Sequence, residues 1–314
     1  MHEQIASLRN RSIQTLRHGL WFGIGLFALL GPAALAHAAE AVEPEKRVYK
    51  TTVDSDGEPV ELHLHVFKPE GWTADDERPA IVFFFGGGWV SGTPMQFYPH
   101  CRDLAGRGLV AFSAEYRVKN RHGTSPLACV EDGKSAVRYL RQHADRLGID
   151  PERIVAGGGS AGGHVAASTG VLEGFEADNE DASISSVPNL MILFNPVIDT
   201  SPKRGFGARR VPGDDPLILS PLHHVHKGQP PSFIFHGDAD TTVKIDSVRD
   251  FETKSHRIGA SCTLVEFEGA GHGFFNHEDF RKPKRGEPDY YAITMRGVDA
   301  FLIEHGYLDK NATE

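Results

Sequence analysis

The sequence of 314 residues contains only three cysteines, Cys101, Cys129 and Cys262, and none of them lies in a CxxC pair or at a Cys/His spacing typical of zinc sites. An odd number leaves at least one thiol unpaired. A Cys101–Cys129 bridge in an oxidising compartment and three buried free thiols both remain open. The chain also has no cluster of Lys and Arg with interleaved aromatics, and its net charge is −9. We therefore expect no metal, no cofactor and no nucleic-acid partner.

No apolar run is long enough to span a bilayer comfortably. The longest, at 20–31, follows three arginines and precedes small residues with an Ala-His-Ala pattern at 36–38. This order is typical of a secretory signal peptide, so we expect residues 1–38 to be removed and the mature chain to begin at Ala39. The prediction is a secreted or periplasmic protein with no stable membrane insertion. A retained N-terminal anchor is the alternative.

The remaining chain has no internal repeat, and from residue 79 buried strands alternate with amphipathic helices. Strands are expected at 47–53, 60–68, 80–85, 109–114, 153–156, 190–194, 232–235 and 262–267. Helices are expected at 98–106, 127–147, 161–172, 244–258 and 290–305. This alternation predicts one α/β domain over 45–308, with a mostly parallel central sheet and helices on both faces. Residues 199–230 are rich in Pro, Gly and charge, and indicate a lid insertion.

The most informative motif is Gly-Gly-Ser-Ala-Gly at 158–162, which lies between an expected strand and an expected helix. A serine at G-x-S-x-G spacing in this context is typical of a nucleophile elbow, because the sharp turn leaves no room for side chains two residues away. A phosphate-binding turn is a weaker interpretation, since no Lys-Ser/Thr pair follows the glycines. A plain tight-packing turn is the structural alternative. The motif makes Ser160 a candidate nucleophile.

A serine nucleophile needs a base and a group that orients the base, and on this fold they follow in the order Asp/Glu and then His. His272, flanked by glycines, follows the strand at 262–267, and we predict that it is the general base. Asp240, in the segment after the strand at 232–235, is the predicted orienting carboxylate. Asp238 is its competitor and could instead brace the loop.

An oxyanion hole requires backbone amides that converge on the developing negative charge. The run Gly86-Gly87-Gly88-Trp89 directly follows the strand at 80–85, where this fold places that loop. We predict the amides of Gly87, Gly88 and Ala161 as donors, although three glycines could also form a plain turn. Trp89 is the predicted substrate contact, and core packing is the alternative for it.

Several other residues favour structural roles. We expect Glu115-Tyr116-Arg117 to brace the glycine loop by hydrogen bonds, and His164 to be a packed helix residue. Three histidines lie in the predicted lid, and we expect surface positions for them rather than a metal site: His223, His224 and His226. Phe97 and Tyr98 fit either a pocket wall or the core.

Taken together, these segments resemble the esterase/lipase group of the α/β-hydrolases, which is related to hormone-sensitive lipase and to bacterial acetyl- and feruloyl-esterase-like enzymes. The resemblance spans about residues 80–275 and implies a triad of Ser160, Asp240 and His272, with an oxyanion hole at Gly87, Gly88 and Ala161. One position departs from the His-Gly-Gly-Gly common in this group, because Phe85 replaces the histidine. This departure and the lack of a long N-terminal helical cap favour the smaller carbohydrate-esterase-like relatives.

The function expected from these observations is cofactor-independent hydrolysis of short-acyl esters. Small esters and acetyl or feruloyl esters linked to polysaccharide are the expected substrates. A peptidase of the prolyl-oligopeptidase type shares the triad order, although the chain has no room for a propeller domain. A non-catalytic binding protein on the same fold is the alternative from another class, and such proteins typically lose a triad member. Oligomeric state is not predicted.

Overall fold

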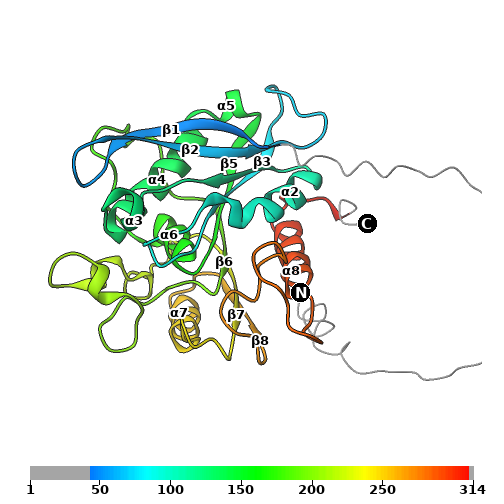
Figure 1. Cartoon of the computed structure of the whole chain (residues 1–314). Helices are drawn as coiled ribbons and strands as arrows, with labels where there is room; N and C mark the ends of the chain where they lie inside the picture. The colour runs from blue at the N-terminus through cyan, green and yellow to red at the C-terminus, as the bar shows by residue number, and fades with distance from the viewer. Residues whose placement is uncertain (1–42, 311–314) are drawn as a thin grey trace, which may run out of the picture. The chain divides into compact units, whose positions relative to one another are not determined.

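The computed structural model describes residues 43–310, and its centre is an eight-stranded sheet (Figure 1). In spatial order the strands are β1 (Glu45–Val53), β2 (Pro59–Phe67), β4 (Val110–Ala114), β3 (Arg78–Phe84), β5 (Ile149–Gly159), β6 (Leu190–Phe194), β7 (Ser232–Gly237) and β8 (Cys262–Phe267). The pairs β1–β2 and β2–β4 are antiparallel, and every other pair is parallel. The predicted α/β-hydrolase fold is confirmed.

The burial pattern of the strands agrees with the pattern of apolar and polar residues in their sequences. All five residues of β6 are buried, as expected for a central parallel strand covered on both faces. In β2, by contrast, polar residues alternate with Leu62, Leu64 and Val66, which are buried, and β2 pairs with β1 in the predicted antiparallel hairpin.

Helices cover both faces of the sheet (Figure 1). One face carries α2 (Tyr98–Gly106) and α8 (Tyr290–Glu304). Their contact includes a hydrogen bond of 2.9 Å from the Tyr291 hydroxyl to Asp103. The other face carries α4 (Pro126–Gln142), α6 (Ala161–Val171) and α7 (Asp246–Arg257). Every residue of α6 is buried, so this helix forms the centre of that layer.

Two expected elements differ in extent. The helix expected over 127–147 divides at His143 into α4 and a single turn, α5 (Ala144–Leu147), which ends at Gly148 in a left-handed conformation. β5 (Ile149–Gly159) extends beyond the expected strand at both ends; at its carboxyl end Gly157 and Gly158 still pair with β3 and β6, and Gly159 pairs with β6. These glycines lack the β-propensity that sequence patterns detect, and the pairing of their neighbours holds them extended.

Residues 199–230 form loops with three short 3₁₀ helices, at Ala208–Arg210, Pro216–Leu219 and Pro221–His223. A further helical turn, α3 (Lys119–His122), follows β4, and Pro94–Phe97 is a 3₁₀ turn before α2. None of the helices at 43–310 combines the length and apolarity that a membrane span needs. The predicted signal peptide and the alternative anchor lie outside the described residues.

The three cysteines are buried and free, so the bridge between Cys101 and Cys129 is not formed. Burial raises the pKa of the Cys262 thiol to about 12, so this group is a neutral part of the core.

Candidate active site

Ser160 lies at the turn between β5 and α6, with φ 56° and ψ −119°. Gly158 and Gly162, two residues before and two residues after Ser160, make the turn possible. A Cβ on Gly162 would lie 2.0 Å from the Phe84 carbonyl oxygen, and one on Gly158 would lie 2.5 Å from the Gly162 carbonyl oxygen. The backbone at Gly162 thus directly contacts the backbones at Gly158 and Phe84, and only glycine fits at positions 158 and 162. The strained conformation of Ser160 holds its hydroxyl above the helix N-terminus.

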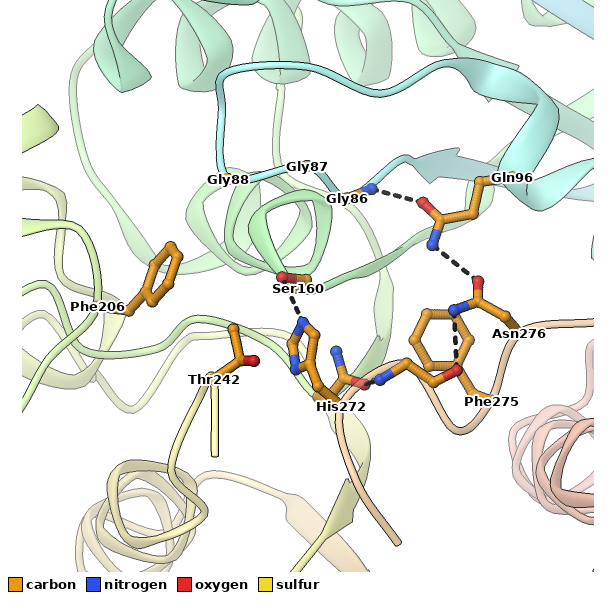
Figure 2. A pocket seen from close by; sticks show the side chains of 12 residues that line it. Gly86, Gly87, Gly88, Gln96, Ser160, Phe206, Thr242, His272, Phe275 and Asn276 are labelled. Atoms are coloured by element: carbon orange, nitrogen blue, oxygen red, sulfur yellow. Dashed lines mark hydrogen bonds between the residues drawn. The ribbon is translucent and has the colours of Figure 1, made fainter. Parts of the chain in front are cut away.

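The structure brings Ser160, His272 and Asp240 together. Nε2 of His272 lies 3.0 Å from Oγ of Ser160 (Figure 2), and Nδ1 lies 2.6 Å from Oδ2 of Asp240. A carboxylate can only accept hydrogen bonds, so Nδ1 carries the proton and Nε2 is free to accept the proton of the serine hydroxyl. The three side chains come from three different loops, each at the carboxyl end of a parallel strand.

The Asp240 carboxylate is buried, and both oxygens have partners. Oδ1 accepts hydrogen bonds from the amides of Thr242 and Val243 at 2.8 and 2.9 Å. Burial raises the pKa of this carboxyl, but the bonds from His272 and from the two amides outweigh it, and the pKa lies below its ordinary value. The competitor, Asp238, accepts a bond of 2.7 Å from the Gly269 amide. Asp238 braces the loop, and it is Asp240 whose carboxylate lies against Nδ1 of His272.

The glycine loop at 86–88 lies beside Ser160, where a Cβ on Gly86 would be 3.4 Å from the Ser160 Cβ. Gly87 and Gly88 have φ of 128° and 63°, a left-handed backbone that glycine adopts without strain. Within residues 43–310, no acceptor pairs with the amides of Gly87 and Gly88, whereas the Gly86 amide donates to Oε1 of Gln96 at 2.7 Å. Ala161 is the first residue of α6, so its amide has no acceptor within the helix.

Two contacts hold this loop from outside. The Tyr116 hydroxyl donates to the Phe85 carbonyl at 2.6 Å, and Arg210, in the loops at 199–230, donates to the Gly88 carbonyl at 2.9 Å. The predicted bracing of the loop therefore comes from Tyr116. Glu115 instead contacts His63 and His65.

A pocket of about 360 Å³ opens over these groups. It is lined by Gly86, Gly87, Gly88, Gln96, Ser160, Asn195, Phe206, Thr242, His272, Gly273, Phe275 and Asn276. Figure 2 shows Ser160 between two ends: Phe206 and Thr242 lie on one side, and Gln96, Phe275 and Asn276 on the other.

The expectation that Trp89 contacts substrate is wrong. Its side chain is only 1% exposed and does not line the pocket. The indole packs against His164 and Phe206, with ring centroids 5.0 and 5.7 Å away. The indole is thus part of the core, and it packs against Phe206, which does line the pocket.

The other histidines have structural positions. His164 is fully buried and bonded to the Leu219 carbonyl at 2.6 Å, and burial lowers its pKa to about 4. In the loops at 199–230, His223 contacts Ser220 and His224 contacts the Leu217 carbonyl. At 43–310 no group of three or more His, Cys, Asp or Glu side chains is placed to hold a metal ion.

The pocket-lining residues that the sequence did not predict include Gln96, Asn195, Phe275 and Asn276. Phe275 and Asn276 directly continue the Gly-His-Gly segment that was selected, so proximity to His272 was a usable signal for them. Gln96 lies in the 3₁₀ turn before α2, and Asn195 follows β6. No motif marks either position, and only the strand order brings them to the site.

Comparisons with known proteins agree with this geometry. The family model described as BD-FAE matches residues 64–208, and that of the dienelactone hydrolase family matches 216–292. Esterase LipC of Mycobacterium tuberculosis is 28% identical over 69% of this chain, and Carboxylesterase NlhH of the same species is 28% identical over 74%. The chain spans 57% of LipC and 77% of NlhH. It also spans 51% of a probable isoprenylcysteine alpha-carbonyl methylesterase of Arabidopsis thaliana, so it covers about half the length of some curated relatives.

Among solved structures, esterase 2 of Thermogutta terrifontis phosphorylated by paraoxon is 47% identical, with a TM-score of 0.76. The match covers 86% of this chain and 96% of that one. The fold, the site and this identity together place the chain in the α/β-hydrolase family. Within that family the chain is one of the esterases.

Proposed function

We propose that the protein is a serine carboxylesterase in which Ser160 attacks the ester carbonyl. His272 takes the hydroxyl proton and delivers it to the leaving alcohol, while Asp240 keeps the imidazole oriented. The amides of Gly87, Gly88 and Ala161 stabilise the oxyanion, and water then releases the acid from the acyl-enzyme. The observation that carries this proposal is the hydrogen-bonded series from Ser160 through His272 to Asp240 in an esterase-family fold.

The acyl group is proposed to be short. Phe275, Gln96 and Asn276 line the end of the pocket opposite Phe206 and Thr242 (Figure 2), and the acyl group is proposed to lie at this end. Related structures of the Thermogutta terrifontis esterase are described as propionate-bound and butyrate-bound, which supports acids of this size. Between the two esters, acetyl is proposed over feruloyl, because acetyl is closer in size to propionate and butyrate.

The alcohol is proposed to be polar, such as a sugar hydroxyl of a polysaccharide. A second cavity of about 340 Å³ shares Phe206 and Thr242 with the first. Its walls carry charged and hydroxyl side chains, including Asp199, Lys203 and Lys244, which supports a hydrophilic occupant. Export fits a polymeric substrate outside the cell, and a mature N-terminus at Ala39 in the recovered protein tests that part.

The test of the nucleophile is Ser160→Ala. We expect hydrolysis of p-nitrophenyl acetate to fall by at least about 10⁴-fold, because the acyl-enzyme cannot form. Labelling by a fluorophosphonate probe should disappear, while circular dichroism and the melting temperature stay near those of the parent protein. Retention of most activity would contradict the assignment.

The parent protein itself tests the two alternative functions. Faster cleavage of dipeptide anilides than of esters would favour the peptidase, and no reaction with the probe would favour the binding protein.

A further inference from the structure

Two side-chain carboxamides connect the glycine loop to the histidine loop across the pocket (Figure 2). The Gly86 amide donates to Oε1 of Gln96 at 2.7 Å, and Nε2 of Gln96 donates to Oδ1 of Asn276 at 2.8 Å. Nδ2 of Asn276 then donates to the Gly273 carbonyl at 2.9 Å. Gln96 and Asn276 are 180 residues apart, and we call this pair the carboxamide bridge.

The ends of the bridge fix its chemistry. It begins at a backbone donor, the Gly86 amide, and it ends at a backbone acceptor, the Gly273 carbonyl. Each member must therefore accept on one side and donate on the other. Carboxamides do this, whereas an ionised carboxylate only accepts and an alkyl chain does neither.

Each end of the bridge adjoins a group of the proposed mechanism. Gly86 precedes Gly87, a proposed oxyanion donor, and Gly273 follows His272, the proposed base. The Gly273 amide is also held, because it donates to Oδ1 of Asn195 at 2.9 Å. Both the amide and the carbonyl of Gly273, the residue after His272, are thus held, the carbonyl through the bridge.

The bridge is also part of the pocket wall. Gln96 and Asn276 line the pocket next to Phe275, which is 1% exposed and packs against Phe97 and Phe194. Phe275 cannot move without disturbing this stack, so Phe275 and the two carboxamides form a fixed part of the wall at this end. The opposite end, at Phe206 and Thr242, continues into the second cavity.

We propose that Gln96 and Asn276 are positioning residues that hold the oxyanion amides and His272 in register, and that the same bridge limits the acyl group to short chains. The proposal rests on the proposed esterase function. Misplacement of reacting groups by a fraction of an ångström lowers kcat, and removal of a wall changes which substrates fit.

Two substitutions at Gln96 separate the two roles. Gln96→Met keeps the length of the side chain and loses both hydrogen bonds, so we expect kcat on p-nitrophenyl acetate to fall about tenfold with KM within about twofold. Its preference among acetyl, butyryl and octanoyl esters should not change. Gln96→Ala should show the same loss of kcat on acetate and a relative gain of about tenfold or more in kcat/KM on octanoate.

Asn276→Leu breaks the other half of the bridge. If the two carboxamides act as one unit, the double variant Gln96→Met/Asn276→Leu should lose no more than about twofold beyond either single variant. The rate of labelling by the fluorophosphonate probe should fall in step with kcat, because phosphonylation uses the same serine, histidine and amides.

The matched control is Gln229→Met, at a buried glutamine away from the pocket whose side chain bonds Ser255 and the His226 amide at 3.0 and 3.2 Å. It should lower the melting temperature without changing kcat or the acyl preference.

Parent-like kcat in Gln96→Met, or multiplicative losses in the double variant, would overturn the positioning role. An octanoate gain absent from Gln96→Ala, or one that appears only when the alcohol is lengthened, would overturn the acyl wall. A parent protein that neither reacts with the probe nor cleaves esters would instead refute the proposed function.

Discussion

Asp240 shows how much of the site depends on a single buried carboxylate. One of its oxygens holds His272, and the other accepts the amides of Thr242 and Val243. Nε2 of His236 lies 3.5 Å from the same oxygen that holds His272, but it also bonds the Val243 carbonyl at 2.8 Å. The loop from 237 to 243 is therefore built around the carboxylate, which stays ionised because its pKa is lowered.

At this residue we predict the effect of Asp240→Asn. The asparagine can keep its oxygen toward the two amides, which turns its NH₂ group toward Nδ1 of His272. The imidazole must then carry its proton on Nε2, the wrong tautomer for a base, and kcat on p-nitrophenyl acetate should fall about 10⁴-fold. Steady-state kinetics with circular dichroism as a check on folding measure this.

Asp238→Asn is the matched control, two residues away. Its oxygen can still accept the Gly269 amide, so kcat should stay within about twofold of the parent value. Equal losses in the two variants would show that the carboxylates do not differ in role.

At the scale of elements, the decisive unit is β5, the serine turn and α6. β3 and α6 are in backbone contact through Gly162, and β5 and β6 support the turn, where the Ser160 amide donates to the Phe194 carbonyl at 3.0 Å. Because α6 is buried throughout, it cannot move away to relieve a clash at its first turn.

For this unit we predict that Gly162→Ala destabilises the fold by about 3 kcal/mol, since the new methyl group meets backbone oxygens that cannot rotate aside. Gly106→Ala is the comparison, because nothing lies within 4 Å of its added Cβ at the end of α2. That variant should be neutral or more stable by up to about 1 kcal/mol. Urea denaturation of both variants tests the pair, and similar losses in the two would contradict the packing argument.

The same scale shows which elements a sequence can predict. The bounds of α2, α6 and α8 follow from apolar periodicity and from Gly or Pro at their ends, and the expected ranges agree with the structure to within a residue or so. The division of α4 from α5 at His143 has no comparable signal. The conformation of 199–230 also has none, because proline and glycine exclude long helices without selecting a particular path.

At the scale of the whole folded domain, a layer of aromatic side chains joins α2 and α8 to the sheet around His100. His100 is fully buried, its ring lies within 6.1 Å of Phe83, Phe97, Phe194 and Phe275, and in the described part of the chain neither ring nitrogen has a hydrogen-bond partner. Burial lowers its pKa to about 3, with a smaller contribution from His277. The native state therefore keeps this imidazole neutral.

This burial predicts how the stability of the domain depends on pH. Below about pH 6.5 the His100 imidazole is protonated in the unfolded chain, whereas in the native state it stays neutral down to about pH 3. The free energy of unfolding therefore falls as the solution is acidified. The contribution of this group is about 1.4 kcal/mol per pH unit. His100→Phe should remove that part of the slope between pH 6 and 4, as measured by urea denaturation at each pH.

Replacing the exposed His224 with Gln is the control, and it should leave the slope as it is. A variant at His100 with the parent slope would mean that its imidazole is not kept neutral by the core. His164, with its pKa lowered to about 4, should account for some of the acid sensitivity that remains.

Local spacing in the sequence was enough to predict the class of fold, the serine turn and the histidine that the structure places beside it, because a strand followed by glycines, glycines around serine and glycines around histidine are all local patterns. Asp240 was predicted over Asp238 mainly because of the resemblance to the esterase/lipase group, and the structure places Asp240 against His272. Tertiary structure alone decided what surrounds them. It buried Trp89, whose bulky apolar ring was needed in the core, and it brought Gln96, Asn195 and Asn276 together from separate loops. The physical reason is that a motif encodes the conformation of its own backbone, whereas the walls of a pocket depend on the order of strands in the sheet, which no short stretch of sequence contains.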